Sequence, residues 1–167
     1  MSMKTLVAGA AVAAGLSAAI AAPLAEKEAA VIPVLAPWSG PYGGVPPFDK
    51  VTVPQLMPGL EIAMAEALAE VDRIAANPAA PTFDNTIAAM ERSGRTLDRV
   101  VTIYGIYSST LNDEAVQAVE REMAPRLAAF SDQITQNEAL FKRIAAVYEA
   151  RETSGLTPEQ QRLVWLQ

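Results

Sequence analysis

The chain has 167 residues, a formal net charge of −6 and a hydrophobic content of 51%, while only 6% of its residues are aromatic. The length suits one domain or part of a larger protein, and the alanine-rich, aromatic-poor composition favours helices over a β-sandwich. The acidic charge argues against nucleic-acid binding, and the absence of histidine and cysteine excludes disulfides, thiol catalysis and histidine-ligated metal sites within this chain.

The first residues have the pattern of an export signal. Lys4 supplies a positive start, an apolar run covers residues 6–20, and Ala19-Ile20-Ala21 offers the small residues that a signal peptidase reads. We therefore expect residues 1–21 to be a cleaved signal peptide and the product to be periplasmic or secreted. A membrane anchor is the alternative. However, the run is short for a span and no cluster of charges follows it, so we expect no stable membrane anchor.

Residues 22–53 are expected to form an irregular arm, because repeated prolines and glycines interrupt any helix there. The apolar residues of this arm are expected to anchor it across the helical domain. They are Trp38, Tyr42, Val45, Phe48, Val51 and Val53.

Residues 54–167 follow a helical period. The helical pattern of the first helix begins at Pro54, which can lie in a first turn, and ends at Asn77-Pro78. Pro58 is also tolerable if the helix starts near residue 55 or later. Its apolar face is Leu56, Leu60, Ala63, Met64, Ala67, Leu68, Val71 and Ile74. A second helix is predicted over residues 83–110, continuous through Gly94. Its seam reads Ile87, Met90, Gly94, Leu97, Val101 and Tyr104.

Three more helices are predicted towards the end of the chain. The third covers residues 114–136 with a kink at Pro125, and its stripe is Val116, Val119, Met123, Leu127, Phe130 and Ile134. The fourth is capped by Asn137 and ends near residues 153–155. Its inward residues are Leu140, Phe141, Ile144, Val147 and Tyr148. The fifth opens with a Thr157-Pro158-Glu159-Gln160 capping box, and Leu163, Val164, Trp165 and Leu166 begin its apolar face.

The predicted fold class is therefore all-α: an antiparallel array of about five helices preceded by an irregular arm rich in proline and glycine. Short turns between the helices predict antiparallel neighbours.

Few side chains suggest chemistry. The paired carboxylates have surface-like neighbours and are expected to lie on solvated faces. They are Glu26 with Glu28, Asp113 with Glu114, and Glu120 with Glu122. Ser108-Ser109-Thr110 lacks a nucleophile elbow and a histidine base, and Met64, Met90 and Met123 are expected in the core. We therefore predict no catalytic, cofactor-binding or metal-binding residue in this chain.

Four blocks resemble, in order, sequences of the thimet-oligopeptidase-like zinc metallopeptidases, in particular the group of peptidyl-dipeptidase Dcp and oligopeptidase A. The first is Pro41-Tyr42-Gly43-Gly44-Val45-Pro46-Pro47-Phe48-Asp49-Lys50-Val51. The second is Thr82-Phe83-Asp84-Asn85-Thr86-Ile87 with Met90-Glu91-Arg92-Ser93-Gly94 and Leu97. The third is Glu122-Met123-Ala124-Pro125 with Leu127 and Phe130-Ser131-Asp132, and the fourth is Leu156-Thr157-Pro158-Glu159-Gln160-Gln161-Arg162.

The resemblance implies a mostly helical fold with a channel between two halves, and a zinc enzyme that cleaves short peptides. The family binds zinc through a His-Glu-x-x-His helix and a downstream glutamate, and no position of this chain matches that motif. We therefore expect residues 54–167 to be the truncated N-terminal part of an exported oligopeptidase or peptidyl-dipeptidase, inactive alone and binding no zinc. The alternatives are a self-standing periplasmic module that binds peptides without catalysis, and an unrelated helical bundle.

Overall fold

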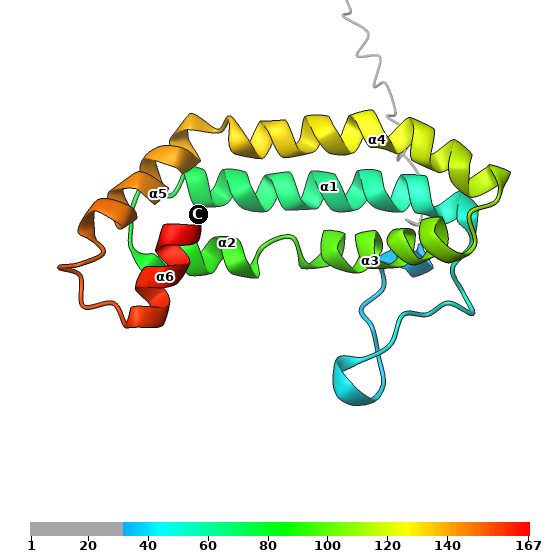
Figure 1. Cartoon of the computed structure of the whole chain (residues 1–167), viewed down its shortest axis with the longest axis horizontal. Helices are drawn as coiled ribbons and strands as arrows, with labels where there is room; N and C mark the ends of the chain where they lie inside the picture. The colour runs from blue at the N-terminus through cyan, green and yellow to red at the C-terminus, as the bar shows by residue number, and fades with distance from the viewer. Residues whose placement is uncertain (1–31) are drawn as a thin grey trace, which may run out of the picture.

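The computed structural model describes residues 32–167 and confirms an all-α fold for this part of the chain (Figure 1). The α-helices are α1 (Val53–Ala75), α2 (Ala88–Arg92), α3 (Arg95–Thr110), α4 (Glu114–Thr135), α5 (Glu138–Ala150) and α6 (Pro158–Leu166). Shorter helical turns are η1 (Pro33–Leu35), η2 (Pro41–Gly43) and the π-type η3 (Phe83–Ile87). The expected signal peptide, residues 1–21, and residues 22–31 of the arm lie outside the described residues.

Helix α1 is the central element of the array. Figure 1 shows it between α4 on one side and the α2–α3 segment on the other. It runs antiparallel to α3, as the short connections predict, and α4 then returns antiparallel to α3. Helices α5 and α6 fold back beside the end of α1 and bring the last residues of the chain close to α2.

The described residues form two separate apolar cores. The first core joins η1 and the start of α1 to α3 and α4, and its fully buried side chains include Val34, Leu56, Leu60, Ile103 and Met123. The second core is smaller and joins η3, α5 and α6 through Ile87, Val147 and Val164. Because each core is contributed by elements distant in sequence, burial of apolar surface fixes the two ends of the array independently.

The first helix has Pro54 in its first turn, as predicted. Helix α1 starts at Val53, and the Gln55 side chain accepts a hydrogen bond of 3.2 Å from the backbone N–H of Thr52, which precedes the helix. Pro58 therefore lies inside the helix instead of in its first turn. The apolar face is confirmed, although its members Leu68 and Ile74 are only half-buried.

The second predicted helix is wrong as a single element. It is divided into η3, α2 and α3, and the break falls at Ser93 and Gly94. Gly94 has φ 72° and ψ 9°, a left-handed conformation that ends one helix and precedes the next. The seam also shifts after the break. Val101 is 40% exposed, whereas Val100 and Ile103 are completely buried.

The last three helices agree better with prediction. Helix α4 runs without a break through Pro125, and its predicted stripe is buried or half-buried. Asn137 caps α5 through a 2.9 Å bond from the Leu140 N–H, but α5 ends at Ala150, earlier than expected. The Thr157–Gln160 capping box of α6 is present, with bonds of 2.9 and 3.3 Å.

Four of the residues predicted to face inward in these helices are instead exposed, because neighbouring elements cover only one side of α5 and α6. They are Phe141, Tyr148, Trp165 and Leu166.

The arm meets its expectation only in part. Of the residues predicted to anchor it, Val51 is buried, and Trp38 and Val53 are half-buried against the first core. The other three lie in a loop that leaves the helices, and they are exposed. They are Tyr42, Val45 and Phe48.

Candidate functional site

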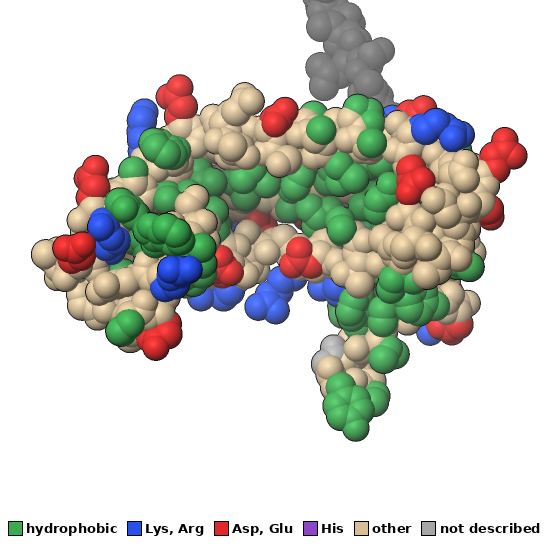
Figure 2. Space-filling view, viewed as in Figure 1, with side chains coloured by type: hydrophobic (Ala, Val, Ile, Leu, Met, Phe, Trp, Pro, Cys, Tyr) green, Lys and Arg blue, Asp and Glu red, His purple; other side chains and the backbone are tan. Residues whose placement is uncertain are grey.

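A hollow runs along one side of α1. Figure 2 shows hydrophobic side chains gathered in this hollow, between α4 and the α2–α3 segment. Charged residues border it, as expected when an apolar strip is flanked by solvated helix faces. The hollow makes α1 the floor of a candidate binding surface.

An open, polar cleft of about 400 Å³ lies where α1 meets η3 and α2. One wall comes from the last turns of α1 and the other from η3, α2 and the residue after it. The lining residues are Glu70, Arg73, Ile74, Asn77, Asp84, Asn85, Ala89, Arg92 and Ser93. Carboxylate and guanidinium groups therefore both line the cleft. This pattern suits the polar main chain and the charged ends of a peptide.

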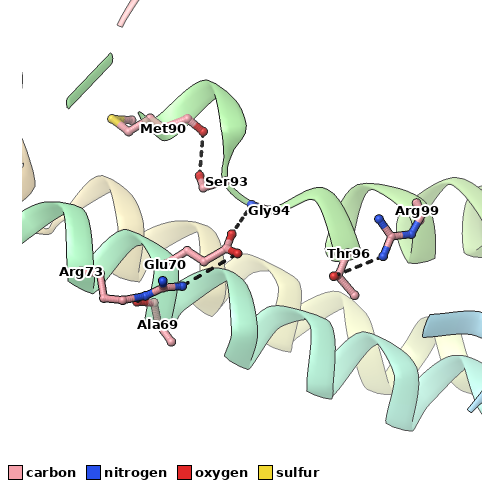
Figure 3. A network of polar contacts seen from close by, with 8 residues as sticks. All are labelled: Ala69, Glu70, Arg73, Met90, Ser93, Gly94, Thr96 and Arg99. Atoms are coloured by element: carbon pink, nitrogen blue, oxygen red, sulfur yellow. Dashed lines mark hydrogen bonds and ion pairs between the residues drawn. The ribbon is translucent and has the colours of Figure 1, made fainter. Parts of the chain in front are cut away.

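Glu70 holds the two walls of this cleft together (Figure 3). Its Oε2 accepts a 2.7 Å hydrogen bond from the backbone N–H of Gly94, at the break between α2 and α3. Ser93 closes the end of α2 by donating from its hydroxyl to the Met90 carbonyl at 2.7 Å. The second Glu70 oxygen lies 3.9 Å from Arg73, but that pair is largely solvent-exposed and contributes little to stability. The hydrogen bond between Glu70 and Gly94 is thus the main contact that holds the two walls of the cleft together.

Arg143 is a buried cation beside the cleft, only 6% exposed. Its Nη1 donates to the carbonyls of Asn77 at 2.7 Å and Ala79 at 3.0 Å, just beyond the end of α1. Its Nη2 donates to Asn85 Oδ1 at 2.8 Å and Thr86 Oγ1 at 3.3 Å. These acceptors are neutral, so hydrogen bonds and the carbonyl-rich end of α1 stabilise the charge.

The sequence reasoning missed Arg143, although a signal was present. It lies three residues after Leu140 and four before Val147, which places it on the buried stripe of α5. A charged residue on such a stripe indicates a specific partner set, because an unpaired buried charge is strongly unfavourable. Glu70 offers no comparable signal, since its partner Gly94 is distant in sequence.

The paired carboxylates considered from the sequence do not form a catalytic pair. Asp113 caps α4 by accepting a 2.9 Å bond from the Val116 N–H, and Glu122 lies 3.6 Å from Arg126 on an exposed face. Arg126 also pairs with Glu61 and so links α4 to α1. Glu26 and Glu28 lie outside the described residues.

The other candidates have structural environments. The hydroxyls of Ser108, Ser109 and Thr110 donate to backbone carbonyls of their own helix. Met64 and Met123 are buried in the first core, as expected, and Met90 is half-buried.

Metal-binding capacity can be tested from the donor groups. Within residues 32–167, no three histidine, cysteine, aspartate or glutamate side chains are close enough to hold a metal ion. The whole chain lacks the nitrogen and sulfur donors that zinc sites commonly use. The residues present therefore do not fit the zinc site that the sequence resemblance implies. In the same part of the chain, no helix combines the length and apolarity needed to cross a bilayer.

One titratable group beside the first core is perturbed. Burial, and secondarily the nearby Glu120 carboxylate, raise the pKa of Tyr104 above its ordinary value of 10.0. Its neighbour Tyr107 is buried, and its hydroxyl donates a 2.9 Å hydrogen bond to the Val51 carbonyl. Both tyrosines therefore belong to the packing of α3 and not to an open site.

Comparison with known proteins supplies a second line of evidence. The chain is 34% identical to a dipeptidyl carboxypeptidase of Escherichia coli over 119 residues, which cover 71% of this chain and 18% of that protein. It is 22% identical to oligopeptidase A of Escherichia coli over 132 residues, covering 79% of this chain and 19% of that protein. An organellar oligopeptidase A of Arabidopsis thaliana is 22% identical over 122 residues, 71% of this chain and 15% of that protein. No protein-family model matches. The chain thus spans less than a fifth of the length of the curated relatives that it matches.

Proposed function

The chain belongs to the thimet oligopeptidase family, with dipeptidyl carboxypeptidase and oligopeptidase A among its relatives, and on this premise we propose that it is the N-terminal part of an exported, zinc-dependent oligopeptidase or peptidyl-dipeptidase. The observation that carries the proposal is the 34% identity to a dipeptidyl carboxypeptidase over 119 residues that make up only 18% of that relative. In this proposal the zinc-binding part lies in polypeptide beyond this chain.

The role proposed for this segment is to form part of the wall of a substrate channel. The apolar hollow along α1 and the polar cleft at its end suit the same class of ligand. That class is short peptides, which have apolar side chains and charged termini. Glu70 and Arg143 hold the helices that border these surfaces. This chain would then position substrates, while the chemistry belongs to another part of the enzyme.

The location proposed is the periplasm or the exterior of the cell. It rests on the signal-peptide pattern of residues 1–21, which begins with Lys4 and ends with Ala19-Ile20-Ala21. Determination of the N-terminal residue of the exported product would test it, with Ala22 expected.

Two measurements test the enzymatic proposal. Sequencing the gene beyond codon 167 should reveal a His-Glu-x-x-His segment in the same frame or in a recently interrupted one. The purified 167-residue chain should retain no zinc after dialysis and should not cleave short peptides. A downstream sequence without this segment would count against the proposal, and zinc-dependent cleavage by the chain alone would contradict the division of roles.

A self-standing module that binds peptides is the second candidate. The observation that favours it is the closure of two cores within the described residues, since Val164 of α6 is only 2% exposed and completes the second core. Calorimetric titration with short peptides would support this reading if the sample is monomeric and melts cooperatively. An aggregated or molten chain cannot be such a module.

A further inference from the structure

The segment between η1 and α1 forms a loop that projects away from the helices, and we name residues 38–48 the Tyr42 loop (Figure 1). Its two sides are held by an antiparallel bridge between Ser39 and Val45, with a 3.1 Å bond from the Val45 N–H to the Ser39 carbonyl. In Figure 2 its hydrophobic tip extends beyond the rest of the molecule. The loop is therefore an ordered projection.

The shape of the loop comes from its backbone. The Gly44 N–H donates a 3.1 Å bond to the Pro41 carbonyl and closes the tip. Gly44 has φ 98°, and a Cβ at this position would lie 2.6 Å from the backbone carbon of Trp38. Glycine is thus required there, because a side chain would prevent the two sides from approaching. Just after the loop, Val51 is buried and its carbonyl accepts a hydrogen bond from the Tyr107 hydroxyl. The chain is therefore held against α3 where the loop ends.

Trp38, at the start of the loop, packs against the first core, but three apolar side chains nearer the tip remain exposed within the described residues. Tyr42 is 104% exposed, Val45 is 59% exposed and Phe48 is 43% exposed. Tyr42 also has φ 59° and ψ 31°. This left-handed conformation is unfavourable for a non-glycine residue. An exposed aromatic ring on a strained backbone, with no contact inside residues 32–167, indicates that a contact outside this segment uses it.

We propose that the Tyr42 loop docks into an apolar pocket on the remainder of the full-length peptidase and fixes α1 relative to it. This inference rests on the proposed function. The matched segment makes up only 18% of the dipeptidyl carboxypeptidase, so most of a relative's polypeptide lies outside the matched segment and could provide the pocket.

The size of the contact favours the same polypeptide over a second copy of this chain. Three side chains at a loop tip bury far less than the roughly 1,000 Å² that a stable interface between separate proteins needs. A covalently linked partner needs less area, because linkage supplies a high effective concentration. The docking partner is therefore the rest of the longer chain.

The test uses a single thiol. The sequence has no cysteine, so Tyr42→Cys introduces the one reactive thiol into this chain, and Gln133→Cys, an exposed polar position on α4, is the matched control. Each variant is made in the 167-residue chain and in a full-length chimera. The chimera is the Escherichia coli dipeptidyl carboxypeptidase in which residues 32–167 replace the region that contains its 119 matched residues. Reaction with a maleimide is followed by peptide mass spectrometry, which separates the introduced thiol from any other.

In the 167-residue chain, the thiols at both positions should react at the same fast rate. In the chimera, reaction at position 42 should slow by about tenfold or more while the control stays fast, because thiol reactivity follows exposure. Tyr42→Ser in the chimera should also lower its melting temperature but leave that of the chain alone unchanged.

Each other outcome overturns the proposal. A folded, active chimera in which position 42 reacts as fast as the control would show that the loop makes no docking contact. That result would leave the proposed function intact. Protection in the 167-residue chain that disappears on dilution would identify a second copy as the partner. A chimera that neither folds nor cleaves peptides would remove the proposed function, and this inference with it.

Discussion

The Tyr107 hydroxyl donates a buried hydrogen bond of 2.9 Å to the backbone carbonyl of Val51, two residues before α1 begins. This bond joins α3 to the base of the Tyr42 loop across 56 positions of sequence. It therefore determines where the irregular arm enters the helical array. Neither α1 nor α3 alone could specify that position.

Removing the hydroxyl should weaken this junction. We expect Tyr107→Phe to lower the free energy of unfolding by about 1 kcal/mol, because a buried carbonyl loses its partner. Urea unfolding of the 167-residue chain measures the change. Tyr148→Phe, at a position that is 38% exposed, is the control and should have no effect. Equal stability of the two variants would show that water replaces the hydroxyl at Val51.

The contact between η1 and α1 should be sensitive to a single methyl group. A Cβ on Gly59 would collide with the Val34 side chain, so Gly59→Ala should destabilise the fold by about 1–3 kcal/mol through overpacking. Val34→Ala should restore part of this loss. A double-mutant cycle measures the coupling between the two sites. Strictly additive effects would contradict the close packing.

The helix break at Gly94 can be tested against a matched glycine in the next helix. Gly94→Ala forces a side chain into a left-handed conformation and should cost about 1 kcal/mol. Gly105→Ala lies within α3, where a Cβ meets nothing, and should stabilise by about 0.5–1 kcal/mol. Chemical denaturation compares the two. Stabilisation by both substitutions would instead support the continuous helix expected from the sequence.

Arg143 should be the most sensitive charged residue of the second core. Arg143→Met removes the donor to four oxygen acceptors and should cost about 2–4 kcal/mol. The two carbonyls beyond α1 lose most, because Asn85 Oδ1 still accepts from the Thr82 N–H and the Thr86 hydroxyl. Lys142→Met changes a neighbouring, exposed cation and should alter stability by less than about 0.5 kcal/mol. Urea midpoints provide the measurement. Similar losses of stability in both variants would mean that the positive charge, and not the set of hydrogen bonds made by Arg143, stabilises the fold.

Tyr104 should make stability fall at alkaline pH. Burial, followed by Glu120, raises its pKa in the folded state, so the folded chain keeps a proton that the unfolded chain releases. This contribution is present below the ordinary pKa of 10.0 and is lost as the pH rises through the higher folded value. Tyr104→Phe should flatten the alkaline decline in melting temperature, and Glu120→Gln should flatten it less. An unchanged slope in Tyr104→Phe would exclude this group.

The helical parts of the fold were predictable because their determinants are local. The three- and four-residue spacing of apolar residues located α1, α4 and most of α5, and side-chain caps at Asn137 and Thr157 marked helix starts. The break at Gly94 was missed because a single glycine is tolerated in many helices. Here Glu70, 24 residues earlier, accepts the N–H bond that stabilises the break.

The candidate surfaces were less predictable, since burial depends on which elements meet. Phe141 and Arg143 both follow the Asn137 cap of α5, yet the aromatic ring is 66% exposed and the guanidinium is 6% exposed. The partners of Arg143 come from the turn after α1 and from η3. In the same way, Tyr42 has the composition of an anchor but lies at the tip of a projecting loop.

The sequence by itself determined the helical class, the capped starts of α5 and α6, and the exclusion of histidine and cysteine chemistry from this chain. These properties follow from residue identity and short-range spacing. Only the tertiary structure decided that α1 is the central helix, that Glu70 and Arg143 join its end to distant elements, and that the Tyr42 loop stands free of the helices. The physical reason is that such contacts join residues far apart in sequence, and their free energy exists only once the elements pack.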